Sequence, residues 1–156
     1  MSETGRGTEL AAPPSAVFCY CLRVRYAECD AQKVVFNARY GDYVDLATTE
    51  YLRALGFGEE LIDGRLDYQL VKQTTEWKAP ARFDEVLCAS VSTQQLGNTS
   101  FVLAVEFRRR GEAGLLARSE TVYVMVTQAL AKKPLPAEFR AALERGAPDI
   151  IVSHAG

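Results

Sequence analysis

Large apolar side chains recur at every second position over residues 17–26, which gives this stretch two distinct faces. A period of two is typical of a β-strand with one buried face. The pattern ends at Glu28 and Asp30, and a short irregular apolar stretch then extends to Phe36. Phe18, Tyr20, Leu22, Val24 and Tyr26 form one face, and Cys19, Cys21, Arg23 and Arg25 form the other.

The spacing of apolar residues then becomes helical and stays so for about five turns, to residue 55. We expect one long helix here, with Asn37 as its N-cap and Gly56 just after its C-terminal end. No other stretch of the sequence predicts a long helix. The apolar stripe consists of Tyr40, Tyr43, Val44, Ala47, Tyr51, Ala54 and Leu55.

The rest of the chain is rich in predicted strands. The turn at Gly97 and Asn98 and the turn at 111–114 join the last three of them into an antiparallel meander. A short helix over 136–145 follows. One long apolar helix beside so many strands must lie across a single curved sheet, because no other element covers its stripe. The four strands after the helix are predicted at 70–77, 86–96, 101–107 and 115–127.

The length of 156 residues and the apolar fraction of 48% fit one domain with a packed core. We expect a disordered leader over 1–15, the domain over 16–147 and a flexible tail over 148–156. The leader has no apolar core of a signal peptide, and no run reaches the roughly 20 apolar residues of a membrane helix. These features predict a cytoplasmic protein that does not associate with a membrane.

The charge of the chain and its cysteines argue against a nucleic-acid-binding protein and against a metalloprotein. The net charge of −2 argues against a nucleic-acid partner, which basic side chains would have to neutralise. Cys19 and Cys21 share one strand face and are too close in sequence for a bridge, and His154 is the sole histidine. We therefore expect reduced, mostly buried thiols and no metal site.

The segment over residues 25–56 carries a compound motif. Its parts are Glu28-Cys29-Asp30, then Val34-Val35-Phe36-Asn37, then Tyr40, and finally Leu52-Arg53-Ala54-Leu55-Gly56. This motif resembles the signature of the 4-hydroxybenzoyl-CoA thioesterase family of hotdog proteins, and the order of elements over residues 17–127 resembles that family too. In this sequence Lys33 stands where relatives often have glycine.

The resemblance implies an α+β hotdog fold, in which a curved antiparallel sheet of about five strands wraps one central helix. It implies a homodimer or homotetramer with active sites at a subunit interface. It also implies catalytic, substrate-binding and coenzyme A-binding residues. These are Asp30 as the reactive carboxylate, Phe36, Asn37 and Ala38 as backbone N–H donors to the thioester carbonyl, Tyr40 at the substrate, and Arg108, Arg109 and Arg110 at the coenzyme A phosphates.

The residues support this chemistry independently. A carboxylate can attack a thioester or activate water, and a helix N-terminus stabilises the developing oxyanion. Asp30 and Asn37 are seven residues apart across a tight connection, so both can border one site. Three alternatives stay open: Asp30 as a turn residue, Tyr40 as a core residue, and Asp45 as the catalytic acid.

We therefore expect hydrolysis of an acyl-CoA or acyl-carrier thioester, with no cofactor besides the coenzyme A of the substrate. The alternatives are a non-catalytic acyl-ligand binding protein, which has little use for a desolvated Asp30, and an enoyl-thioester hydratase. The hydratase would need an Asp/His pair, and His154 lies in the predicted tail. The sequence leaves open the acyl group and the choice between nucleophilic and general-base attack.

Overall fold

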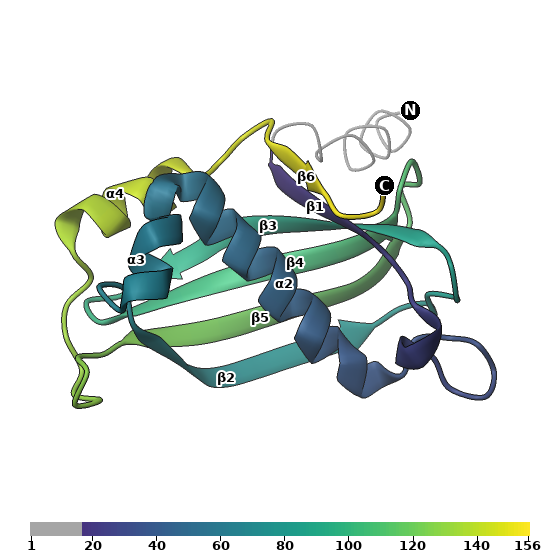
Figure 1. Ribbon diagram of the computed structural model, residues 1–156, viewed down its shortest axis with the longest axis horizontal. Helices are drawn as coiled ribbons and strands as arrows, with labels where there is room; N and C mark the ends of the chain where they lie inside the picture. The colour runs from purple at the N-terminus through teal and green to yellow at the C-terminus, as the bar shows by residue number, and fades with distance from the viewer. Residues whose placement is uncertain (1–16) are drawn as a thin grey trace, which may run out of the picture.

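The computed structural model describes residues 17–156, so the predicted leader over 1–15 lies outside the described residues. A six-stranded sheet curves around one long helix (Figure 1), in the strand order β2-β5-β4-β3-β1-β6. This arrangement is the hotdog fold that the family resemblance implied. The strands are β1 Phe18–Arg23, β2 Tyr68–Trp77, β3 Val86–Leu96, β4 Ser100–Arg109, β5 Leu115–Met125 and β6 Ile151–Ser153.

The central helix α2 spans Tyr40–Leu52 and is preceded by a 3₁₀ turn, Asn37–Arg39. A π-helical turn over Arg53–Phe57 links it to the shorter helix α3, Gly58–Asp63. Gly56 has a φ of 100° within that turn and breaks the helix where the sequence predicted its end. The predicted C-terminal helix is α4, Ala137–Arg145.

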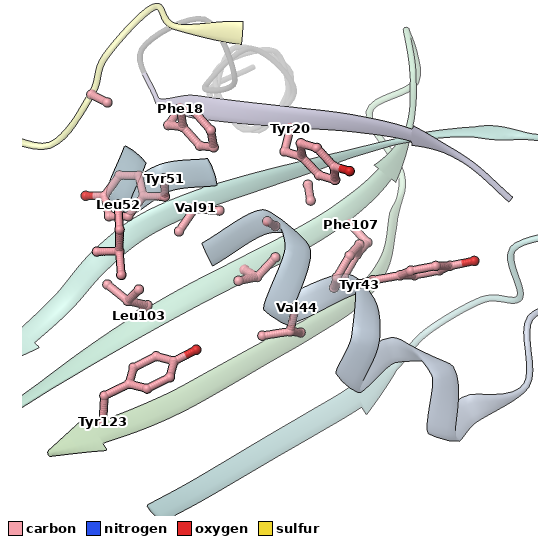
Figure 2. Packing of buried hydrophobic residues seen from close by; sticks show 14 of the residues in the cluster. Phe18, Tyr20, Tyr43, Val44, Tyr51, Leu52, Val91, Leu103, Phe107 and Tyr123 are labelled. Carbon is pink, nitrogen blue, oxygen red and sulfur yellow. The ribbon is translucent and has the colours of Figure 1, made fainter. Parts of the chain in front are cut away.

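The core lies between α2 and the concave face of the sheet. Tyr43 lies beside Phe107 of β4, and Val44 and Leu103 belong to the same apolar cluster (Figure 2). Ala47 is fully buried, so the helix backbone approaches the sheet closely at this small residue. The predicted apolar stripe of the helix is therefore its packing face.

The start of the helix differs from the prediction. Asn37 is the first residue of the 3₁₀ turn rather than an N-cap, and no side chain caps this end. Phe36 occupies the N-cap position with extended backbone angles. The 3₁₀ turn satisfies two of the early N–H groups without a side-chain cap, because the Arg39 N–H donates to the Phe36 carbonyl at 2.8 Å and the Tyr40 N–H donates to the Asn37 and Ala38 carbonyls.

The C-terminal segment, expected as a flexible tail, contains strand β6. It pairs in parallel with β1, with Cys19 opposite Ile151 and Cys21 opposite Ser153. The His154 N–H then donates to the Cys21 carbonyl at 2.9 Å, and His154 Nδ1 lies 3.0 Å from the Tyr20 hydroxyl. These contacts tie the end of the chain to the first strand. Within the described residues no helix is long and apolar enough to cross a membrane.

Candidate active site

The segment from Glu28 to Phe36 folds back on itself as a tight two-stranded loop. The Phe36 N–H donates to the Glu28 carbonyl at 3.0 Å, and the Asp30 N–H donates to the Val34 carbonyl at 2.9 Å. On its other side, the loop is fixed by the Val35 N–H, which donates to the Ala81 carbonyl at 2.8 Å. The loop therefore holds Asp30 in a defined position before the start of the central helix.

Asp30 is solvent-exposed in the single chain and anchored through one carboxylate oxygen. Its Oδ1 accepts the backbone N–H of Gln32 at 2.8 Å and that of Val34 at 3.4 Å. Among residues 17–156, no hydrogen-bond donor contacts Oδ2. The turn role that the sequence left open is real, yet it leaves the second oxygen available for chemistry.

Lys33, the departure from the family pattern, occupies a strained backbone position. Its φ is 62°, in the left-handed region that glycine tolerates best. The Lys33 N–H nevertheless donates to the Asp30 carbonyl, and its own carbonyl accepts the Phe83 N–H at 2.9 Å. Lysine thus adopts a left-handed conformation that glycine tolerates best, and both of its backbone polar groups are hydrogen-bonded.

The N-terminus of the helix offers two backbone donors rather than the three predicted. The Phe36 N–H is already bonded to the Glu28 carbonyl, so it cannot face a substrate. Within the described chain, the N–H groups of Asn37 and Ala38 have no acceptor. These two groups lie at the positive end of the helix dipole, where an oxyanion is favoured.

Glu28 is a buried carboxylate that the sequence analysis placed in the motif without assigning it a role. Its side chain accepts hydrogen bonds from the Tyr43 hydroxyl at 2.7 Å, from the Arg25 N–H at 2.8 Å and from the Arg25 guanidinium at 2.8 and 2.9 Å. Burial raises the pKa of Glu28, but these donors outweigh it and the net pKa is lowered. Glu28 therefore anchors the loop to the helix as a carboxylate.

Tyr40, predicted at the substrate, lies in the core. Its side chain is 2% exposed, and its ring packs edge-to-face on Phe107 at 5.3 Å and on Trp77 at 6.2 Å between centroids. Burial raises the pKa of the hydroxyl to about 12. The geometry favours the packing role that the sequence analysis kept open.

The three arginines predicted at coenzyme A have different surroundings. Arg108 contacts Glu106 at 3.1 Å, and Arg109 contacts Glu85 at 2.7 Å and the Pro80 carbonyl at 2.8 Å. Both belong to the end of β4 rather than to a turn, because the strand runs further than the sequence indicated. Arg110 is exposed beyond the strand, so of the three it is best placed to meet a ligand.

His154, which the sequence placed in the tail, borders a cleft beside the loop. The cleft brings the sole histidine near the buried carboxylate Glu28, although no hydrogen bond joins His154 to Asp30 among the residues described. The prediction that His154 lies in a flexible tail was thus wrong, yet residues 17–156 do not pair it with Asp30 as a hydratase would require. The cleft is lined by Tyr20, Leu22, Arg23, Arg25, Glu28, Tyr43, Leu46 and His154.

Comparison with known proteins gives consistent matches. The family model described as the thioesterase superfamily matches residues 32–115. The acyl-CoA thioester hydrolase YbgC of Escherichia coli O6:H1 is 31% identical over 132 residues, which cover 81% of this chain and 98% of that protein. The structure of a gentisyl-coenzyme A thioesterase matches with a TM-score of 0.71 at 30% identity, over 81% of this chain and 98% of that one.

A second solved structure shares the fold at lower identity. It is a variant of 4-hydroxybenzoyl-CoA thioesterase complexed with 4-hydroxybenzoyl-CoA, and it matches with a TM-score of 0.72 at 18% identity. The match covers 80% of this chain and 96% of that one. This likeness concerns the fold alone.

Proposed function

The chain belongs to the thioesterase superfamily, and from this premise we propose that it hydrolyses the thioester bond of an acyl-coenzyme A. The observation that carries the proposal is the loop carboxylate beside the helix N-terminus. Asp30 Oδ1 is held by backbone N–H groups while Oδ2 is left without a partner among the described residues. Net hydrolysis adds one water molecule across the C–S bond and gives the free carboxylate and coenzyme A as the thiol.

Asp30 acts on the thioester carbonyl carbon in one of two ways. Its Oδ2 attacks directly, forming a mixed anhydride and expelling the coenzyme A thiolate, and water then cleaves the anhydride. Alternatively, Asp30 takes a proton from a water molecule that attacks the carbon itself. In both routes the anchored Oδ1 fixes the direction of Oδ2, which lowers the entropic cost of reaching the reactive geometry.

The N–H groups of Asn37 and Ala38 polarise the thioester carbonyl. They are the donors at this helix end that the fold leaves without acceptors, and they belong to the turn that directly follows the Asp30 loop. Hydrogen bonds aimed at the position of the developing oxyanion contribute a few kcal/mol each, about 2.7–4 kcal/mol in the best-measured case. Arg110 is our candidate for contact with the coenzyme A phosphates, since a guanidinium suits phosphate.

A second copy of the chain completes the site. Strand β2 is the long edge of the sheet, and Leu70 and Val71 are 54% and 55% exposed on it. An uncovered edge with apolar side chains is a surface for strand pairing. Pairing of β2 with its two-fold-related copy would extend the sheet. The partner would then shield the exposed Asp30 loop from water.

The test is release of free thiol from a panel of aromatic and aliphatic acyl-CoAs by wild type and by Asp30→Asn. The asparagine oxygen can still accept the Gln32 N–H, so the loop is kept while the charge is removed. We expect a loss of at least ~10²-fold in rate. Asp63→Asn is the matched control, because Asp63 Oδ1 accepts the Arg65 N–H at 2.9 Å in the same kind of turn at the end of α3.

The outcomes separate the alternatives. Retained cleavage in a folded Asp30→Asn protein would reject Asp30, and Asp45→Asn would then be assayed as the next acid. Binding of acyl-CoAs by wild type without cleavage of them or of carrier-linked thioesters would favour the ligand-binding alternative. Single-turnover reaction in ¹⁸O-labelled water tests the anhydride route, because label enters Asp30 only when an anhydride forms and water cleaves it at the Asp30 carboxyl carbon.

A further inference from the structure

Three of the four cysteines converge on the convex face of the sheet, away from the central helix. Cys21 and Cys88 are opposite each other on β1 and β3, and their sulfur atoms are 3.0 Å apart. Cys19 lies two residues earlier on the same face of β1. The sulfur atoms of all three lie within 4.8 Å of one another.

This group, which we call the three-thiol cluster, brings three potential sulfur ligands together in the folded chain. Binding of a metal ion to such thiols releases their protons. Cys19 and Cys21 are buried, and Ala155 packs over them from the C-terminal segment. A thiolate, rather than a thiol, is the form that binds metal ions.

We propose that the three-thiol cluster of Cys19, Cys21 and Cys88 binds one soft metal ion, Cu(I), through three sulfur ligands. Soft thiolate ligands select soft ions such as Cu(I) and Zn(II). Zinc almost always takes four ligands, and within the described part of the chain the cluster gathers no His, Asp or Glu as a fourth. Burial of Cys19 and Cys21 also limits access of a water ligand, so a three-coordinate ion fits best.

The geometry requires only a small adjustment. A trigonal ion with metal–sulfur bonds of about 2.3 Å holds its sulfur atoms about 4 Å apart. That separation falls between the 3.0 Å of the Cys21–Cys88 pair and the 4.8 Å that bounds the cluster. Changes of side-chain rotamer within two paired strands can supply the difference without moving the backbone.

The site would also join parts of the chain that are distant in sequence. It links β1 to β3, directly beneath the segment where the chain ends. A ligand that binds only the folded state raises the stability of that state. Loading with Cu(I) should therefore raise the melting temperature, which is a readout independent of any hydrolase activity.

The experiment titrates the fully reduced protein anaerobically with Cu(I) against a chromophoric Cu(I) chelator. We expect uptake of one equivalent with sulfur-to-copper charge-transfer absorption. Cys88→Ser should weaken binding by more than ~10-fold, since loss of even an outer-shell partner costs 10–100-fold. Cys29→Ser is the matched control, because Cys29 lies outside the cluster, in the Asp30 loop. The Cys29→Ser protein should bind Cu(I) as tightly as wild type does.

Mass mapping of maleimide-labelled wild type keeps the test valid if the serine variants fold poorly. Cu(I) should protect the partly exposed Cys88 from labelling and leave Cys29, which is also partly exposed, reactive. No uptake, uptake that persists unchanged in folded Cys88→Ser, or preference for Zn(II) over Cu(I) would overturn the proposal. The proposal would also be overturned if Cys21 and Cys88 form a disulfide and the protein takes up no Cu(I) after that disulfide is reduced.

Discussion

At the residue scale, Glu28 and Asp30 are two acids in one loop with opposite surroundings. Both oxygens of Glu28 accept hydrogen bonds from Arg25, and one also accepts the Tyr43 hydroxyl. Asp30 instead has one oxygen held by the backbone and is exposed to solvent. A fully satisfied carboxylate is a poor base or nucleophile, so the structure favours Asp30 for chemistry and Glu28 for support.

Glu28→Gln should lower the free energy of unfolding at pH 7 by about 1.5–3 kcal/mol, the scale of hydrogen bonds to a charged group. Because the folded-state pKa of Glu28 is lowered from its usual 4.5, its contribution is present above about pH 4.5 and is lost as the pH falls through the folded pKa. Urea unfolding should show a smaller difference in the free energy of unfolding between wild type and variant at pH 4 than at pH 7. Exposed Glu59→Gln is the control, and an equal loss in both variants would contradict this role.

Lys33→Gly tests the strained position in the loop. A residue other than glycine costs about 1–2 kcal/mol in left-handed backbone, while glycine loses more freedom on folding, so a gain of up to about 1 kcal/mol is expected. Thermal unfolding measures the change. A clear loss of stability would mean that the lysine side chain contributes contacts that outweigh its φ of 62°.

At the element scale, the break in the long helix is set by a single glycine. Gly56 has a φ of 100°, and a Cβ added there would meet no atom within 4 Å, so any cost comes from the backbone alone. Two residues later, Gly58 has φ −59° and ψ −44°, which are ordinary helical angles. Gly56 therefore has a backbone conformation that favours glycine, whereas Gly58 has one that any residue can adopt.

Gly56→Ala should destabilise the protein by about 1–2 kcal/mol, the cost of forcing a Cβ into left-handed backbone. Gly58→Ala should be neutral or stabilising by up to about 1 kcal/mol, because alanine is favoured over glycine in helices and the exposed Arg53 side chain, 3.2 Å from the added Cβ, can move aside. Chemical denaturation of the two variants side by side measures both effects. Equal destabilisation of the two variants would contradict the assignment of the cost at Gly56 to its left-handed backbone.

The elements best predicted from the sequence are those bounded by local signals. Strand β3 begins and ends at the predicted residues, because Gly97 and Asn98 mark its end. Strand β6 was missed because three residues carry no periodicity, and its pairing with β1 joins positions more than 130 residues apart. The loop carboxylate could be found from its motif. The bond from the Phe36 N–H to the Glu28 carbonyl depends on how the loop folds back on itself, and the approach of Cys88 to Cys21 depends on long-range pairing of β3 with β1.

At the scale of the whole molecule, the end of the chain supports its beginning. Deleting residues 150–156 removes β6, the His154 contact with Tyr20 and the Ala155 cover over Cys19 and Cys21. We expect a lower melting temperature and faster labelling of Cys21 by a thiol reagent. Labelling of Cys29 should change little, since it lies in the Asp30 loop, and unchanged Cys21 labelling would show that β6 does not protect this face.

Val71→Asp should weaken the proposed pairing of β2 strands, because it would add a negative charge to each of the two paired edges and remove an exposed apolar side chain. Sedimentation velocity should then show dissociation, with loss of thioester hydrolysis as Asp30 loses its cover. Ile62→Asp, at a more exposed position on α3, is the control. A wild type that sediments as a monomer and still hydrolyses acyl-CoA would reject the shared site.

The position of β6 also limits how far such an assembly can grow. Within the described chain, the sheet ends in ten-residue β2 on one side and in three-residue β6 on the other, which covers β1. A three-residue edge offers too few backbone groups to recruit another strand. In the language of polymer chemistry the subunit is a monofunctional monomer, so edge-to-edge joining of sheets terminates after one step and cannot propagate into a fibre.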